Sequence, residues 1–139
     1  MEKMQKYNNY IATNNSNMPN NKSKFLTDAE IAKEKLDTIS PSFCLAKWKQ
    51  VSLHLPTGLN NSCYHPPLHE IPVETLNNNP SSLHNTRQKK DIRKLMIAGK
   101  KPNECQYCWK MESNGDLSDR HYRSGEPWAQ MDPATIDWQ

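Results

Sequence analysis

The alternation of apolar and polar residues is clearest in the middle of the chain. Val51, Leu53 and Leu55 alternate with polar neighbours, which predicts a β-strand whose apolar side faces inward. Residues 56–58 have the composition of a turn, and a second strand is expected over residues 59–64. Together the two strands predict an antiparallel β-hairpin.

A helical pattern precedes the hairpin. Thr27 and Glu30 form a capping-box pattern, and Ile31 and Leu36 supply an apolar face. We therefore expect a short helix that ends before Pro41, because proline cannot continue a helix.

The clearest helical pattern follows the hairpin, within residues 85–101. Asn85 is the expected N-cap, and Gly99 suits the left-handed position that often follows a helix. The expected buried stripe has i, i+3, i+4 spacing and consists of Ile92, Leu95 and Met96. A further short helix is expected at about 105–111, whereas the polar residues 113–128 predict a loop with at most one helical turn.

The composition limits the size of the hydrophobic core. The chain has 139 residues, of which 35% are hydrophobic, and its mean hydropathy is −0.97. A core this thin usually needs a metal site or a partner domain. Residues 1–24 are rich in Asn, Lys and Ser and predict disorder. The expected fold class is α+β: a small metal-stabilised domain with a β-hairpin and two or three short helices, preceded by a disordered N-terminal tail.

The charge does not decide between classes of partner, but the hydropathy pattern indicates a cellular compartment. The net charge of +3 is mildly basic and does not by itself indicate a nucleic-acid partner. No apolar run approaches transmembrane length, and the N-terminus lacks the apolar core of a secretion signal. We therefore expect a cytoplasmic protein with no membrane partner. Since structural disulfides are rare in the reducing cytosol, the cysteines are interpreted first as metal ligands.

The four cysteines have the spacing C-x18-C-x41-C-x2-C and are Cys44, Cys63, Cys105 and Cys108. Four thiolates suit tetrahedral zinc or the four corners of a [4Fe–4S] cluster. A zinc ribbon usually has two C-x2-C pairs, so the single pair here shifts the interpretation towards iron–sulfur. Zinc, a redox or free pair at Cys105 and Cys108, and ordinary buried thiols remain open alternatives.

Residues near these cysteines are further candidates. His65 and His69 could each replace a cysteine as a ligand, although such a histidine is more often a surface or hydrogen-bonded residue. Tyr107 and Trp109 flank Cys108 and could shield a metal centre from water, or could simply be core residues.

Two polar groups are interpreted as surface features. Between residues 87 and 101 there are seven basic residues and one acid, Asp91, which allows contact with phosphate or an acidic partner. A solvated face is the favoured interpretation, because no interleaved aromatic residues support nucleic-acid binding. Asp119, Arg120 and His121 are also expected at the surface, since no nucleophile or pocket accompanies them.

Three longer stretches carry a family resemblance. They are FCLAKWKQVSLHLPTGLNNSCYHP, LHNTRQKKDIRKLMIAGKKPNECQYCWKMES and DLSDRHYRSGEPWA, within residues 41–130. Together they resemble the N-terminal region of twitch-domain-containing radical SAM proteins, which are common in marine bacteria and their phages. In that family a cysteine opens a β-hairpin, a second cysteine follows it, and a basic helix ending in xxGKxPxxCxxC brings the last two. The resemblance implies that Cys44, Cys63, Cys105 and Cys108 hold an auxiliary iron–sulfur cluster.

The resemblance does not extend to the family's catalytic part. Its members continue into a barrel whose C-x3-C-x2-C motif binds and cleaves S-adenosylmethionine, and no three cysteines here have that spacing. The implied function is an auxiliary [4Fe–4S] cluster-binding accessory module, truncated before the barrel, with no S-adenosylmethionine and no enzymatic activity expected on this chain alone. The implied divisions are a tail (1–24), a twitch-like four-cysteine domain (25–130) and a truncated end (131–139).

The resemblance also implies a partner and a location. The expected partner is a separate radical SAM catalytic domain or protein, in the cytoplasm, or in the host cytoplasm if the protein is phage-encoded. The alternative function is a small zinc-binding interaction module that contacts nucleic acid through the basic helix. A cytosolic thiol oxidoreductase is a third option, but it lacks the βαβ context that such a motif normally has.

Overall fold

The structure, a computed structural model, describes residues 27–130. The predicted tail at 1–24 and the predicted end at 131–139 lie outside the described residues. The helices and strands, in chain order, are α2 (Asp28–Asp37), α3 (Ala46–Lys49), β1 (Ser52–His54), β2 (Leu59–Asn61), β3 (His69–Glu70), α4 (Arg87–Ile97), α5 (Gln106–Ser113) and α6 (Asp119–Gly125). Short 3-10 helices connect them: η1 (Leu55–Thr57), η2 (Val73–Thr75), η3 (Pro80–Leu83), η4 (Asn103–Cys105) and η5 (Pro127–Gln130).

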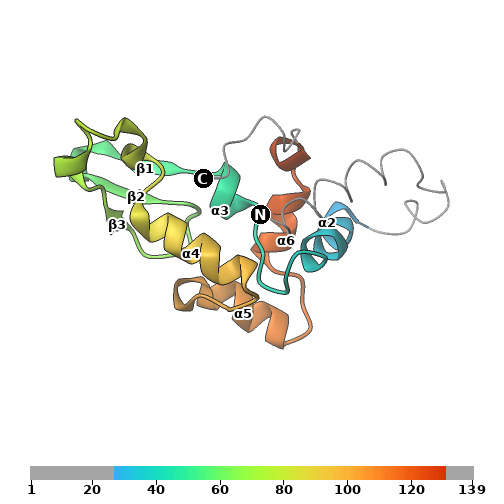
Figure 1. Ribbon diagram of the computed structural model, residues 1–139. Helices are drawn as coiled ribbons and strands as arrows, with labels where there is room; N and C mark the ends of the chain where they lie inside the picture. The colour runs from blue at the N-terminus through green and yellow to red at the C-terminus, as the bar shows by residue number, and fades with distance from the viewer. Residues whose placement is uncertain (1–26, 131–139) are drawn as a thin grey trace.

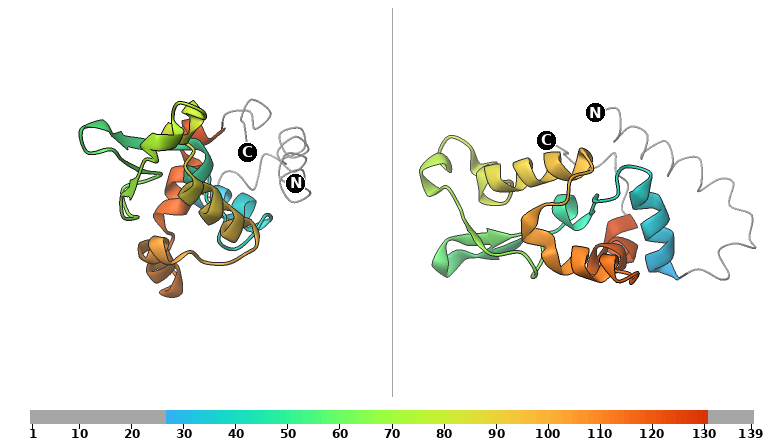
Figure 2. Two further views of the ribbon diagram at one scale, coloured as in Figure 1. Left: turned by 60° about the vertical axis from the view of Figure 1, so that its left-hand side comes forward. Right: turned by 90° about the horizontal axis from the view of Figure 1, so that it is seen from below.

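The described part is long and narrow, with the sheet at one end. The helices α2 and α6 lie at the other end, and α3, α4 and α5 lie between them (Figure 1, Figure 2). Within residues 27–130 no helix combines the length and the apolar character needed to cross a membrane.

The mixed α and β content and the antiparallel hairpin predicted from the sequence are confirmed. β1 pairs with β2 in antiparallel register, with Leu53 opposite Asn60. The turn between them contains Gly58, whose φ of 67° is in the left-handed region that glycine adopts without steric cost. β2 also pairs with the two-residue strand β3, which the sequence did not predict.

The prediction that Val51, Leu53 and Leu55 face inward is wrong. Their exposed fractions are 43%, 37% and 64%, whereas Asn60 and Asn61 on β2 are buried. Asn60 donates a hydrogen bond from Nδ2 to the carbonyl oxygen of η3 residue Leu83 at 2.8 Å. Leu53 and Asn60 are directly opposite and share one face of the sheet, so the difference lies between the strands: the buried residues belong to the central strand β2 and the exposed ones to the edge strand β1 and its ends.

The helix α2 begins at the predicted capping box. The Glu30 amide donates to Thr27 Oγ1 at 3.3 Å, and the Thr27 amide donates to Glu30 Oε2 at 2.7 Å. α2 packs against α6, and the two backbones come very close at Gly125. A Cβ atom at that position would lie 2.9 Å from the carbonyl oxygen of Asp28.

The predicted helix within residues 85–101 is confirmed as α4, with corrections at its start and on its buried side. The N-cap is Thr86 instead of Asn85, because the Lys89 amide donates to Thr86 Oγ1 at 3.3 Å. Gly99 follows the helix with a φ of 76°, as predicted. Met96 is buried, but Leu95 is 38% exposed, so the apolar stripe is narrower than expected.

Two basic residues of α4 are buried, which contradicts the uniformly solvated face expected for this helix. Lys89 and Arg93 are 4% and 8% exposed. Lys89 Nζ donates to the carbonyl oxygen of His84 at 3.0 Å, and Arg93 donates to the Lys47 carbonyl oxygen at 3.3 Å and to Asn85 Oδ1. Burial lowers the pKa of Lys89 to about 8. The side chains of Lys89 and Arg93 therefore stabilise the packing of α4 within residues 27–130.

The polar stretch 113–128 forms the helix α6 in place of the predicted loop. Ser118 is its N-cap, and the Ser118 amide donates to His121 Nδ1 at 3.0 Å. Arg120 and His121 are 3% and 0% exposed, so the prediction that they lie at the surface is wrong. Glu112 accepts from Arg120 Nε at 2.7 Å, whereas His121 Nε2 lies 3.8 Å from Glu112 and has no hydrogen-bond partner within residues 27–130.

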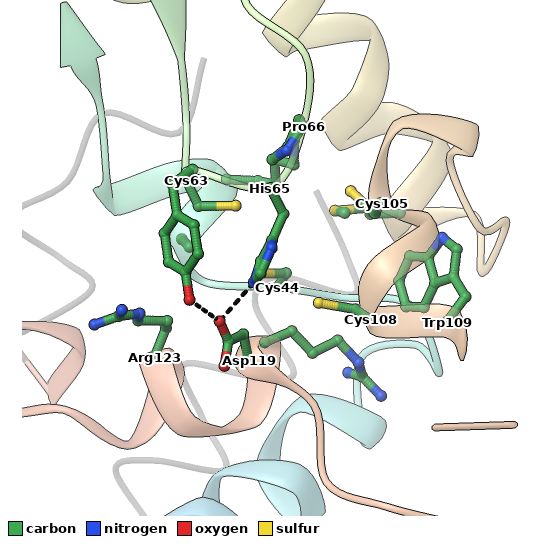
Figure 3. A pocket seen from close by; sticks show the side chains of 14 residues that line it. Cys44, Cys63, His65, Pro66, Cys105, Cys108, Trp109, Asp119 and Arg123 are labelled. Carbon is green, nitrogen blue, oxygen red and sulfur yellow. Dashed lines mark hydrogen bonds and ion pairs between the residues drawn. The ribbon is translucent and has the colours of Figure 1, made fainter. Parts of the chain in front are cut away.

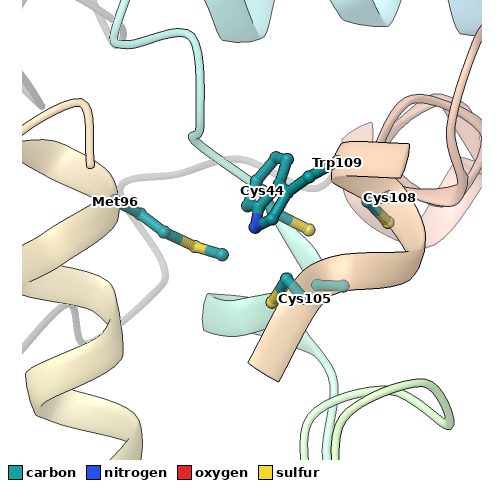
Figure 4. Packing of buried hydrophobic residues seen from close by; sticks show 6 residues of the cluster. Cys44, Met96, Cys105, Cys108 and Trp109 are labelled. Atoms are coloured by element: carbon teal, nitrogen blue, oxygen red, sulfur yellow. The ribbon is translucent and has the colours of Figure 1, made fainter. Parts of the chain in front are cut away.

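Buried apolar side chains form two clusters that meet at residues 43–46. Phe43 and Leu45 belong to one cluster, whereas Cys44 and Ala46 belong to the other. The first cluster is completed by Leu36, Ile39 and Ala129. In the second, Met96 and Trp109 pack with three cysteines, Cys44, Cys105 and Cys108 (Figure 4). Three of the predicted ligands are therefore also core residues.

Candidate metal centre

All four cysteines line a single pocket, which has about 440 Å³ of space free of protein atoms, part of it open to solvent. Cys44 precedes α3, Cys63 follows β2, Cys105 ends η4 and Cys108 lies in the first turn of α5. In Figure 3 the sulfur atoms of Cys63, Cys105 and Cys108 point into the pocket from different sides. Four positions that span 65 residues of sequence, 44 to 108, thus converge on one place.

The local folds explain this convergence. Antiparallel pairing of β1 and β2 brings the segment before β1, which contains Cys44, close to the segment after β2, which contains Cys63. The end of α4 and the turn at Gly99 direct the chain into η4 and α5. Trp109 Nε1 donates to the carbonyl oxygen of Pro102 at 2.8 Å, which fixes the start of α5 against the preceding segment.

The four thiols are free and neutral in this structure. None of the four cysteines, all within residues 27–130, forms a disulfide. Burial raises the pKa of Cys44 to about 11 and that of Cys105 to about 12, and it also raises the pKa of Cys63 and Cys108. In the described part of the chain no three His, Cys, Asp or Glu side chains stand in an arrangement that could hold a metal ion. Neutral thiols pack as small apolar groups, so a metal would have to displace their protons and draw the sulfur atoms inward.

Hydrogen-bond donors already face three of the four sulfur atoms. The Ala46 amide donates to Cys44, and the His65 amide donates to Cys63, in both cases from two residues further along the chain. Cys108 accepts from the Arg120 amide, as α6 packs over α5. These bonds act against the effect of burial, because they stabilise the thiolate. Donors of this kind also stabilise thiolates that bind metals, so the donor set fits a thiolate-bound inorganic group.

Positive charges also line the pocket: Lys47, Arg120 and Arg123. Lys47 is 4% exposed and its Nζ pairs with Glu104. Burial opposes the charge of Lys47, but Cys105 and Glu104 raise its pKa on balance. A centre held by four thiolates carries net negative charge, and buried cations in the wall would offset it.

The two candidate histidines have different surroundings. His65 lines the pocket, and its Nε2 lies 2.6 Å from Asp119 Oδ2. His69 lies in β3 and is not among the residues that line the pocket; its Nε2 lies 2.7 Å from Thr86 Oγ1. The structure therefore brings His65 to the cysteines, but not His69.

Several residues of the pocket were not expected from the sequence. Asp119 and Arg120 were interpreted as surface residues, and Lys47, Tyr64 and Arg123 were not considered. Their presence follows from the packing of α3 and α6, which no periodicity in the sequence announces. The family resemblance covers the stretches that contain these residues, but it implied a role only for the four cysteines. Of the two aromatic residues beside Cys108, Trp109 lines the pocket, whereas the half-exposed Tyr107 stacks on His65 outside it.

A second polar cluster has the composition of a hydrolase site but is closed to solvent. Ser118 Oγ donates to Glu112 at 2.6 Å and lies 3.5 Å from His121 Nδ1. Ser118 and His121 are 1% and 0% exposed. Because a nucleophile must reach its substrate and this serine already donates to a carboxylate, the cluster is structural.

No protein-family model, curated protein or solved structure matches this chain.

Proposed function

We propose that Cys44, Cys63, Cys105 and Cys108 bind one [4Fe–4S] cluster, and that the chain is the auxiliary cluster-binding module of a radical SAM enzyme. The observation that carries the proposal is that four cysteines from four separate segments line one pocket. The resemblance to the N-terminal region of twitch-domain radical SAM proteins supports the same four ligands and supplies the enzyme class.

The preference for a cluster over a single zinc ion rests on the cysteine spacing and the family resemblance, because the size of the pocket does not separate the two occupants. Four thiolates around zinc lie about 2.3 Å from the ion and leave no space between them. Of the roughly 440 Å³ free of protein atoms, which includes open solvent, only about 20 Å³ can take the centre of a water-sized sphere, so the sulfur atoms and the lining would have to rearrange around either occupant. Zinc is the alternative occupant and is decided by the experiment below.

The remaining residues of the pocket would hold and shield the group. Met96 and Trp109 pack against Cys44, Cys105 and Cys108 and exclude water from that side. Lys47 would offset part of the thiolate charge from within the protein, as its burial and its contact with Glu104 suggest. A [4Fe–4S] cluster supplies one-electron transfer or a site that anchors a substrate. No catalytic residue is proposed on this chain.

The test is the composition of the full chain purified without oxygen. We expect about four iron and four sulfide per chain, with the visible absorption of a cluster. Cys44→Ala and Cys63→Ala should each lower the iron content sharply, whereas Ser113→Ala, an exposed change on α5, should not. One zinc per chain without sulfide, retained through purification, would overturn the iron–sulfur proposal in favour of the zinc module.

The accessory role has a separate test. The nucleotide sequence downstream of this reading frame should encode a C-x3-C-x2-C motif, or a separate barrel protein should bind the cluster-loaded chain. If neither is found, the chain would be a cluster-binding protein without the proposed enzyme partner.

The nucleic-acid role of the alternative function has less support. Lys89 and Arg93, two of the basic residues on α4, are buried in packing contacts. The more accessible Arg87, Lys90 and Lys94 line a polar surface pocket, but Arg87 and Lys94 both pair with Asp91. Salt-dependent RNA or DNA binding that is lost in Lys90→Ala would support the nucleic-acid role.

A further inference from the structure

Cys63 is the cysteine with the least support from regular structure. The other three are 7% or 8% exposed and lie in the second core cluster, whereas Cys63 is only half-buried and is not part of it. It lies in residues 62–68, an irregular segment between β2 and β3 that we call the Cys63 loop. Nearby, the buried side-chain oxygens of Asn61 and Ser62 have no hydrogen-bond partner within residues 27–130. Something else must hold this sulfur at the pocket.

Asp119 supplies two strong hydrogen bonds to the Cys63 loop. Its Oδ2 accepts from the Tyr64 hydroxyl at 2.6 Å and pairs with His65 Nε2 at 2.6 Å (Figure 3). Burial would raise the pKa of Asp119, but the hydrogen bonds from Tyr64 and His65 lower it on balance. The group is therefore a carboxylate, and hydrogen bonds to an ionised acceptor are roughly twice as strong as neutral ones.

His65 connects Asp119 to the sulfur of Cys63 and to α5, the helix that carries Cys108. Its backbone amide donates to Cys63. Its ring stacks on Tyr107, with centroids 3.9 Å apart and an interplanar angle of 14°. Tyr107 stands between Cys105 and Cys108 in the sequence. One imidazole thus touches Asp119 on α6 and Tyr107 on α5 while its amide holds the sulfur of Cys63.

We propose that Asp119 is a positioning residue for Cys63, acting through His65 and the Tyr107 ring on which His65 stacks. It fixes the Cys63 loop against α5 and α6, so that the fourth sulfur stays at the pocket occupied by the other three. The link to metal binding rests on the proposed function, but the positioning of Cys63 is a property of the metal-free chain.

The experiment measures the reactivity of each cysteine in the reduced, chelator-treated full chain. Iodoacetamide is added at fixed pH, and mass spectrometry gives the alkylation rate of each thiol separately. In Asp119→Ala we expect Cys63 to react about tenfold faster or more, since two hydrogen bonds to a charged group are lost. Cys44, Cys105 and Cys108 should stay within about twofold of the unmodified protein, since their anchoring in the core is unchanged. The matched control is Asp116→Ala, a neighbouring exposed carboxylate, which should leave all four rates unchanged.

A second variant separates position from charge. Asp119 also raises the pKa of Cys63 through its negative charge, so its removal alone could increase reactivity. His65→Phe keeps that charge and the ring stack on Tyr107, but it removes the hydrogen bond to Asp119. It should therefore also raise the Cys63 rate selectively. If Asp119→Ala does not fold, judged by its circular dichroism, His65→Phe decides alone.

The alkylation rates test the positioning of Cys63 independently of whether the chain binds a metal. An unchanged Cys63 rate in His65→Phe, or an equal increase at all four cysteines, would overturn the positioning role. If the purified chain binds iron, Asp119→Ala should also lose iron to a chelator faster than Asp116→Ala does. If the chain binds none, the alkylation rates still decide where Cys63 is held, and only the metal proposal fails.

Discussion

The guanidinium of Arg120 donates a hydrogen bond to the carbonyl oxygen of Phe43 at 2.8 Å. The same side chain pairs with Glu112 at 2.7 Å and with Asp37 at 3.2 Å, although it is almost fully buried. It therefore joins α6 to α5, to α2 and to the segment that carries Cys44. A helix made of polar residues is in this way attached to both core clusters.

Arg120→Met should be strongly destabilising. The substitution keeps the size of the side chain but leaves the mostly buried Glu112 without its cation and the Phe43 carbonyl oxygen without its donor. Breaking a buried ion pair from one side typically costs about 3–5 kcal/mol. Urea unfolding of the metal-free protein measures the loss. The matched control, Arg87→Met, removes an exposed ion pair with Asp91 and should cost only a small fraction of this. Equal losses in the two variants would contradict the prediction.

His121 should make the protein less stable in mild acid. Burial and the neighbouring Arg120 lower the pKa of His121 from 6.5 to about 4. Between these values the unfolded chain binds a proton that the folded chain does not, so stability is present above pH 6.5 and is lost as the pH falls towards 4. The nearby carboxylates Glu112 and Asp37 also have lowered pKa values and stay ionised over most of this range. Lys33 on α2 adds a further positive charge that disfavours the imidazolium.

The contribution of His121 is measurable by substitution. Between pH 7 and pH 4.5 the unmodified protein should lose on the order of 2 kcal/mol through this residue, by linkage from the two pKa values. His121→Gln does not titrate, and Gln can still accept the Ser118 amide at this helix position. Urea unfolding at both pH values should show a smaller loss in His121→Gln, whereas His84→Gln, at an exposed histidine, should behave as the unmodified protein does. Identical pH profiles for the protein and His121→Gln would refute the assignment.

Local signals in the sequence predicted local structure well. The Thr27–Glu30 capping box, the turn with Gly58 and the helix that ends before Gly99 depend on residues within a few positions of one another. Which strand of the hairpin is buried depends instead on β3 and η3, which come from later in the chain and contact β2. Hydropathy could not predict this, since the buried residue Asn60 is polar; its Nδ2 donates to the Leu83 carbonyl oxygen, whereas its Oδ1 has no hydrogen-bond partner within residues 27–130.

The sequence indicated the four cysteines of the candidate site but not the other residues that line the pocket. Thiol spacing and the family resemblance led to the four residues that line the pocket. Helix α6 was missed because its buried residues, among them Arg120 and His121, are polar, and hydrophobic periodicity does not register ion pairs. Asp119 came to the pocket through that packing, so no pattern near the cysteines could have indicated it, whereas Lys47 lies only three residues after Cys44 and carried no signal of burial.

Gly125→Ala should test the close approach of α2 and α6. A Cβ atom at Gly125 would lie 2.9 Å from the Asp28 carbonyl oxygen and 3.0 Å from its carbon, both of which belong to the backbone. Neither atom can move without shifting α2, so the substitution should cost about 1–3 kcal/mol despite the better helix propensity of alanine. Thermal unfolding of the metal-free protein measures this. Ser113→Ala, at an exposed position at the end of α5, is the control and should leave the stability nearly unchanged. A stabilised Gly125→Ala variant would show that the helices are further apart than described.

Removal of the metal proposed for the pocket should reveal how much that metal contributes to the stability of the protein. Cys44 is buried with Met96 and Trp109, so Cys44→Ala in the metal-free protein loses one small side chain and should cost about 1 kcal/mol. In the metal-loaded protein the same change also removes a ligand. A group that binds only the folded chain stabilises it by mass action, so the loaded protein should lose substantially more than the metal-free protein does. Unfolding by urea before and after chelation, for the protein and for Cys44→Ala, gives the four values needed. If the cost of Cys44→Ala is the same with and without metal, the thiol is a packing residue and does not bind the metal.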